Sequence, residues 1–254
     1  MNGKDFVRLC LARGWAAILR GRSTEHYLTP ETALVVSPHA DDETLGCGGL
    51  IAARAERGLR THIVFLTDSG GTSRNAETRK QQAQIRRHEA ISAVKILGAR
   101  EDDITFLDAP DGQLDRLDDE SKRNLTEGLA LLIRKLNPEE IYLPFYGSHS
   151  TEHQAAHILC RATISASGWN GKLWEYPVWA WWNPPRFAKW FRKKPDPVAL
   201  ALGQHLETKS RALRAHASQH MAGGALPGIL ARICLGQIEF FFPADPAAGL
   251  PPQP

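Results

Sequence analysis

Residues 33–50, ALVVSPHADDETLGCGGL, constrain the fold of this chain more than any other stretch. The apolar run ALVV predicts a buried strand, and the pattern over residues 43–57 predicts a helix. Between the strand and the helix lie three polar residues, His39, Asp41 and Asp42. Ligands of open α/β sheets bind in the crevice at the carboxyl ends of the strands. The turn that carries these three residues is therefore a candidate site.

The residue types on this turn favour a divalent metal as the ligand. His39 and Asp42 are three positions apart, so both side chains reach one ion from a tight turn, and both are metal ligands in proteins. Asp41, between them, then points elsewhere and is free to act on a metal-bound water. The alternative is a helix N-cap formed by Asp41 or Asp42. Capping accounts for one aspartate, but not for two adjacent ones and not for His39.

Composition is ordinary for a globular protein, with 43% hydrophobic and 23% charged residues in a chain of 254. The formal charge of +3 is too small to indicate nucleic-acid binding. The four cysteines form no CxxC pair, which argues against a zinc ribbon or a disulfide framework and favours the reducing cytoplasm. No apolar run approaches the ~18 residues that span a bilayer.

Strands and helices alternate in the sequence after this stretch. The predicted strands are 61–68, 103–107, 140–144, 172–182 and 238–242, and the predicted helices are 77–97, 121–136, 153–165 and 202–217. A strand, a helix and a parallel strand make a βαβ unit. We therefore expect one Rossmann-like α/β domain over residues 31–243, with a mostly parallel sheet flanked by helices and the site at the carboxyl ends of its strands.

The two ends of the chain are expected to lie outside this domain. Residues 1–30 are predicted to be an amphipathic helix over 4–22 followed by a connector. This helix either packs on a protein surface or lies on a membrane surface through its arginines and apolar residues. Residues 244–254 are rich in proline and alanine and are predicted to be disordered.

The run SPHADDETLGCGG resembles the PHxDDE…GCGG pattern of the LmbE-like, or PIG-L-like, zinc-dependent N-acetylglucosamine deacetylases. The resemblance implies that His39 and Asp42 bind the metal and that Asp41 is the general base. It also implies a third ligand, a histidine much further along the chain.

His153 is the predicted third ligand, because it follows another buried strand at the start of another helix. It matches the histidine that ends H-x-D-H in the family's second pattern. His149 takes the position of the family's auxiliary histidine, which stabilises the oxyanion or protonates the leaving amine. The chain departs from the pattern here, with one additional residue between the two histidines and Glu152 in place of the aspartate. Glu152 is a candidate acceptor of a hydrogen bond from a ligand histidine.

Further polar residues are expected near this cluster. Arg86 resembles the arginine of the family's R-x-x-E and is predicted to bind substrate, the alternative being an intrahelical pair with Glu89. Asp68 ends the second strand, where we expect a turn residue close to His39. His157, one helical turn after His153, is expected to be packed rather than to bind metal. His216 is a weaker candidate to face the site.

The aromatic segment KLWEYPVWAWW and the nearby Trp190 admit three interpretations: a surface that stacks on sugar rings, a membrane-interface surface, or an aromatic core. Pro177 suggests that the strand predicted at 172–182 is an edge strand or carries a bulge.

Together these observations predict a metal-dependent hydrolase that removes an acetyl group from an N-acetylated sugar, nucleotide sugar or lipid-linked glycan. The expected cofactor is Zn²⁺, with Fe²⁺ as the alternative. Two histidines and one carboxylate are also the ligand set of non-haem Fe(II) oxygenases. A non-catalytic sugar-binding protein is the third possibility.

Overall fold

The computed structural model describes residues 2–71, 73–148, 150–183, 189, 191, 195–220 and 226–246. Short 3₁₀ helices cover Glu101–Asp103 and Trp179–Trp182. The helices and strands, in chain order, are α1 (Gly3–Arg22), β1 (Thr24–Glu25), β2 (Ala33–Ser37), α2 (Asp42–Glu56), β3 (Thr61–Thr67), α3 (Ala76–Ile96), β4 (Ile104–Ala109), α4 (Asp119–Leu136), β5 (Glu140–Pro144), α5 (Thr151–Ser167), β6 (Lys172–Tyr176), β7 (Val198–Ala201), α7 (His205–Ala215), α8 (Ala217–His220), α9 (Gly228–Cys234) and β8 (Ile238–Ala244).

The strands of these residues form one sheet in the order β1-β7-β8-β6-β5-β2-β3-β4. Only β8 runs antiparallel to its neighbours in the described sheet, β6 and β7. From β2 the chain winds outward through β3 to β4, and then returns to the other side of β2 to form β5. Strand order therefore reverses between β2 and β5, which is the kind of place where open α/β sheets bind ligands.

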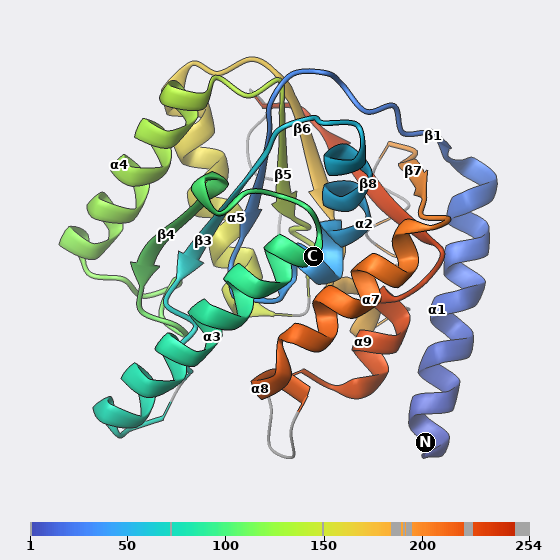
Figure 1. Cartoon of the computed structure of the whole chain (residues 1–254), viewed down its shortest axis with the longest axis horizontal. Helices are drawn as coiled ribbons and strands as arrows, with labels where there is room; N and C mark the ends of the chain where they lie inside the picture. Colours follow the sequence, from blue (N-terminus) through green and yellow to red (C-terminus); the bar gives the residue numbers. More distant parts are fainter. Residues whose placement is uncertain are drawn as a thin grey trace.

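The alternation of side chains along β2 divides the core between the two faces of the sheet. Val35 packs in a cluster with Leu50 of α2 and Ala93 of α3. Leu34 packs on the other face, in a second cluster that contains helices α4 and α5. All five residues of β2 are buried, as expected for a parallel strand covered by helices on both faces. Figure 1 shows the resulting three layers, with α4 and α5 on one side of the sheet.

The glycines of α2 allow its first turns to pack closely against the rest of the fold. A Cβ at Gly46 would lie 2.2 Å from the ring of Tyr176, and one at Gly49 would lie 2.1 Å from Leu202. Beside them, the buried Lys209 donates to the Leu45 carbonyl at 2.9 Å. The run GCGG thus holds the helix that begins at the candidate site tightly in place.

The expected fold class is confirmed, but the structure corrects several boundaries. The strand predicted over 172–182 ends at Tyr176, because Pro177 cannot donate to the ladder, and a 3₁₀ helix follows. It lies inside the sheet between β5 and β8, not at an edge. The last strand continues to Ala244, two residues beyond the prediction. Strands β1 and β7 and helix α9 were not predicted from the sequence.

The N-terminal segment is built into the domain rather than connected to it by a free linker. Strand β1 pairs with β7 in the sheet, and His26 Nε2 lies 2.8 Å from the hydroxyl of Tyr142 on β5. The inner face of α1 is buried through Leu9 and Leu19. Most of the tail that was predicted to be disordered, residues 247–254, lies outside the described residues.

Candidate metal centre

The candidate site lies at the carboxyl ends of β2 and β5, between which the strand order reverses. His39 follows β2, and Asp42 is the first residue of α2. His153 lies in the first turn of α5, which begins after β5. The side chain of Ser150 caps that helix by accepting from His153 N at 3.4 Å. Two strand–turn–helix connections, more than a hundred residues apart in sequence, thus place all three side chains at one edge of the sheet.

These three side chains offer ligand atoms within 4.8 Å of one another. Asp42 Oδ2 lies 3.1 Å from His39 Nδ1 and 3.1 Å from His153 Nε2. The His153 nitrogen is buried, and within the described residues its contact is with Asp42 Oδ2, the oxygen that His39 Nδ1 also approaches. Two ring nitrogens thus converge on one carboxylate oxygen, an arrangement that a metal ion bound between them would satisfy. The donor set of two imidazoles and one carboxylate therefore fits a divalent metal with an open coordination position.

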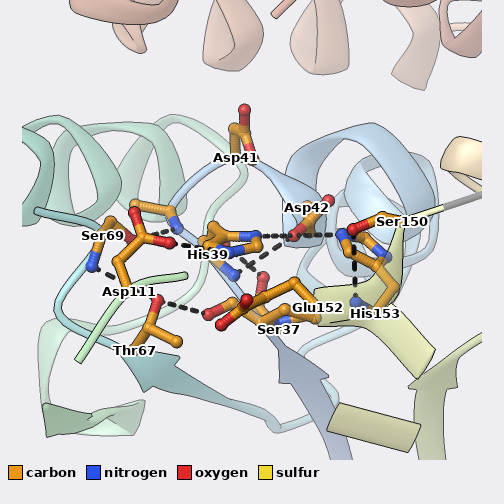
Figure 2. Close-up of polar contacts among 12 residues, drawn as sticks. Ser37, His39, Asp41, Asp42, Thr67, Ser69, Asp111, Ser150, Glu152 and His153 are labelled. Carbon is orange, nitrogen blue, oxygen red and sulfur yellow. Dashed lines mark hydrogen bonds and ion pairs between the residues drawn. The ribbon is translucent and has the colours of Figure 1, made fainter. Parts of the chain in front are cut away.

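Asp41 has a different geometry. It occupies the N-cap position of α2, but its side chain makes no capping hydrogen bond, so capping does not explain it. Its backbone φ is 146°, a region that strongly favours glycine, and such strain collects at functional sites. Figure 2 shows its carboxylate projecting away from the row formed by His39, Asp42 and His153. The Asp41 carboxylate thus lies apart from the three candidate ligands, and its action on a metal-bound water stays a prediction.

Asp111 is a site residue that the sequence analysis missed. It lies in the loop after β4, and its Oδ1 is 3.2 Å from His39 Nε2. His39 therefore has a carboxylate at each ring nitrogen, Asp42 at one and Asp111 at the other, as Figure 2 shows. The second oxygen of Asp111 accepts from Gly71 N at 2.8 Å, which fixes the carboxylate. A carboxylate in this position orients a ligand histidine and sets its tautomer.

Burial and charge shift the pKa values of these groups in opposite directions. Burial alone lowers the pKa of His39, but its contacts with Asp111 and Asp42 outweigh burial and raise that pKa well above its usual value. Burial alone raises the pKa of Asp42, yet His153 and His39 outweigh it and hold the pKa low. For Asp41, burial and then the charge of Asp42 raise the pKa to about 8. The cluster thus holds one ionised carboxylate next to one that readily binds a proton.

Arg86 of α3 lies beside Asp111. Its Nη1 donates to the Ser69 carbonyl at 3.0 Å and is 3.8 Å from Asp111 Oδ2. Its Nε is buried and makes no hydrogen bond within the described residues. The alternative pairing with Glu89 is absent, because Glu89 accepts from Ser218 instead. Asp68 is a turn residue, as expected, and accepts from Asp111 N at 3.2 Å, which positions the loop of Asp111.

A buried ion pair between His216 and Glu43 supports the turn that carries Asp41. His216 Nε2 of the segment after α7 lies 3.0 Å from Glu43 Oε1, and the other oxygen of Glu43 accepts from Asp41 N at 3.0 Å. Gln219 donates to the Ala40 carbonyl at 3.2 Å. These contacts hold the backbone on both sides of Asp41. His216 therefore supports the turn and is not a member of the ligand cluster.

The structure bears differently on the other residues that the sequence singled out. His149, the predicted auxiliary histidine, lies outside the described residues. Glu152 makes no hydrogen bond with a ligand histidine and accepts from Leu114 N at 3.2 Å. His157 is packed, as expected, with its Nδ1 3.0 Å from the Pro144 carbonyl. Of the aromatic segment, Trp181 lies in the core, and Trp190 is outside the described residues.

A cavity of about 540 Å³ lies between α1, α9 and β8. Its lining contains none of the three candidate ligands, so it is separate from the metal centre.

Comparisons with known proteins bear on the family and the fold. The sequence profile of the PIG-L family, described as GlcNAc-PI de-N-acetylase, matches residues 34–164, a range that contains all three candidate ligands. A sequence relative, 4-oxalmesaconate hydratase of Pseudomonas putida, is 33% identical over 181 residues, which are 66% of this chain and 64% of the relative.

Two solved structures share the fold. The N,N′-diacetylchitobiose deacetylase of Pyrococcus horikoshii superposes with a TM-score of 0.64 at 19% identity, covering 85% of this chain and 84% of that one. The 4-carboxy-2-hydroxymuconate hydratase of Pseudomonas putida superposes with a TM-score of 0.63 at 22% identity, covering 88% and 99%. The same fold therefore carries both deacetylases and hydratases.

Proposed function

This chain belongs to the PIG-L family, and from that premise we propose that it is a metal-dependent hydrolase that removes an acetyl group from an N-acetylated amino sugar or sugar conjugate. The observation that carries the proposal is the convergence of His39, Asp42 and His153 next to a strained Asp41 that is not part of their cluster. A hydrolase of this kind needs a metal with an open position and a base that does not bind it. The proposed metal is Zn²⁺, with Fe²⁺ as the alternative.

A divalent metal held by these three residues supplies Lewis-acid activation, which polarises an amide carbonyl and lowers the pKa of bound water to about 7. The protein supplies the remaining parts. Asp41 takes a proton from the attacking water, and its carboxylate has no hydrogen-bonded partner within the described residues that would compete for that role. We propose that a protonated His149 donates the proton that the departing amine takes up, and that His149 regains a proton from Asp41 through solvent when the site resets. The products are acetate and a free amine.

Arg86 and Asp111 are the proposed contacts for the rest of the substrate. They lie on the side of His39 opposite to Asp42. The Arg86 Nε has an unused hydrogen, and a guanidinium beside a carboxylate offers donors and an acceptor to the hydroxyl groups of a sugar. One deacetylase among the structural relatives is named for a chitobiose substrate, which supports a sugar as the substrate class. The carrier of the sugar, whether a nucleotide or a lipid, is a further part of the proposal.

Hydration of an unsaturated carboxylate is the second candidate function. The observation that favours it is the 33% sequence identity to a hydratase over 181 residues. A hydratase also needs an activated water and a base, so the same cluster serves it. It has no leaving amine, and Arg86 would then bind a carboxylate.

The test is to supply the metal-loaded enzyme with two panels. One holds N-acetylated sugars, nucleotide sugars and lipid-linked sugars, assayed for acetate. The other holds unsaturated dicarboxylates, assayed for loss of the ultraviolet absorbance of the conjugated double bond. Acetate from the first panel alone supports the deacetylase, and turnover of the second alone supports the hydratase. Oxygen consumption with bound iron, and neither of these products, would instead indicate the oxygenase.

A further inference from the structure

The outward face of α1 is unusually apolar for a helix on a protein surface. Phe6, Val7, Leu11 and Ile18 expose 56%, 54%, 42% and 49% of their surface. They are four of the seven large hydrophobic side chains that are exposed in the part of the chain that the structure describes. Isolated exposed hydrophobic residues need no explanation, but a contiguous patch marks an interaction site. Figure 1 shows α1 standing along one edge of the molecule, with this helix covered on one side only.

The spacing of these residues places them on one stripe. Val7, Leu11, Gly14 and Ile18 recur at intervals of four, three and four residues, which is one face of an α-helix. The opposite face packs on the domain through Leu9, Ala12 and Leu19, which are buried. Packing within the domain therefore explains why the inner stripe is apolar. It does not explain why the outer stripe is apolar.

Cations border the apolar stripe on both sides. With 100° per residue, Lys4 lies next to Leu11 on one border and Arg13 lies next to Phe6 on the other, while Arg20 lies between Phe6 and the buried Leu9. Both arginines also line the cavity between α1, α9 and β8. None of these three cations forms an ion pair within the described residues. The only acidic residue of the helix, Asp5, is on the inner side, where it pairs with Arg8 at 3.5 Å.

We propose that α1 docks on an anionic lipid bilayer, with its apolar stripe in the headgroup region and its flanking cations on the lipid phosphates. An apolar face bordered by Lys and Arg is the pattern of helices that lie in the membrane interface. A second copy of this chain fits the surface less well. Two such helices packed face to face would bring Lys4, Arg13 and Arg20 of both copies together without an acidic side chain between them, and juxtaposed like charges oppose association.

No helix in the described residues is both long and apolar enough to cross a membrane. The proposed contact is therefore peripheral. It is independent of the proposed function, because α1 contributes no residue to the candidate metal centre.

The test is co-sedimentation of the full chain with vesicles. One set is phosphatidylcholine alone, and the other contains about a third phosphatidylglycerol. The variants are Leu11→Glu with Ile18→Glu, and Arg13→Gln with Arg20→Gln. The matched control is Leu131→Glu, which changes a residue that is 61% exposed on α4. Circular dichroism checks the fold of each variant, and light scattering gives its oligomeric state.

We expect the native chain to bind the anionic vesicles and to be released by salt, with little binding to the neutral ones. Each lost cation weakens partitioning roughly fivefold, so the double arginine variant loses about 25-fold. The double glutamate variant no longer binds, and Leu131→Glu binds as the native chain does. The proposal is overturned if the native chain ignores anionic vesicles, or if the glutamates on α1 leave binding unchanged. It is equally overturned if those glutamates convert a dimer into a monomer, which would make a second copy the partner.

Discussion

Asp111→Asn tests whether the carboxylate behind His39 controls the metal centre. In the structure Asp111 Oδ1 lies 3.2 Å from His39 Nε2, while His39 Nδ1 faces Asp42. The Asp111 carboxylate favours a proton on Nε2, which leaves the lone pair of Nδ1 for the metal. An asparagine has the same shape, but it carries no charge and presents an amide nitrogen as readily as an oxygen.

The expected loss of metal affinity follows from the contribution that carboxylates hydrogen-bonded to ligand histidines make in other metalloproteins. Removing a hydrogen-bonded carboxylate behind a ligand histidine costs about 10–100-fold in metal affinity, which is about 1.4–2.7 kcal/mol. The lower pKa of Asp111, which its contact with His39 maintains against burial, indicates that the pair interacts strongly. We therefore expect the dissociation constant of the metal to rise by at least about tenfold.

The assay is competition for zinc against a chromophoric chelator at constant pH. Asp108→Asn is the matched control, because Asp108 lies in β4 three residues before Asp111, is exposed and pairs with Arg87 rather than with the cluster. We expect the control to bind zinc as the native protein does. Equal affinity for zinc in the native protein and in Asp111→Asn would refute the role assigned to Asp111.

Two further predictions concern stability. Gly46→Ala should lower the free energy of unfolding by about 1–3 kcal/mol, because its Cβ would lie 2.2 Å from the ring of Tyr176. In contrast, Gly14→Ala should raise the free energy of unfolding by about 1 kcal/mol, because a Cβ there meets nothing within 4 Å. Urea unfolding measures the change in both variants. A change of the same sign in both would contradict the packing argument. Burial lowers the pKa of His62 to about 4 from 6.5, so the unfolded chain binds more protons between these pH values and stability should fall as the pH falls through that interval. His62→Gln should reduce the loss of stability across this interval by on the order of 3 kcal/mol. An unchanged slope of the free energy of unfolding against pH would contradict the lowered pKa of His62.

The sequence predicted the centre of the molecule well, because the information there is local. The strand before His39 and the helix after Asp42 are both encoded by short, strongly patterned segments. His153 was predicted from its resemblance to the family's second pattern and from its place after a buried strand at the start of a helix, because parallel strands end at one edge of the sheet. These three residues meet as expected. The role of Asp41 as a base remains a prediction.

What the sequence did not reveal depends on contacts between distant segments. Asp111 lies in the run DAPDG, whose residues also suit an ordinary turn. Its loop follows β4, however, and β4 ends at the same edge as β2, so the rule that placed His153 would have found Asp111 as well. Strands β1 and β7 have two and four residues, which is too short for a periodic pattern. They exist because they pair with each other and because β7 pairs with β8.

The measurement that tests the central claim most directly compares the native protein with Asp41→Asn, both loaded with zinc, for metal content and for acetate release from the best N-acetylated substrate. We predict one metal ion per chain in both proteins, because Asp41 is outside the proposed ligand cluster. We predict acetate release by the native protein and a loss of about 100-fold or more in the variant, since its amide cannot accept the proton of water. Full activity in Asp41→Asn, or loss of its metal, would contradict the account.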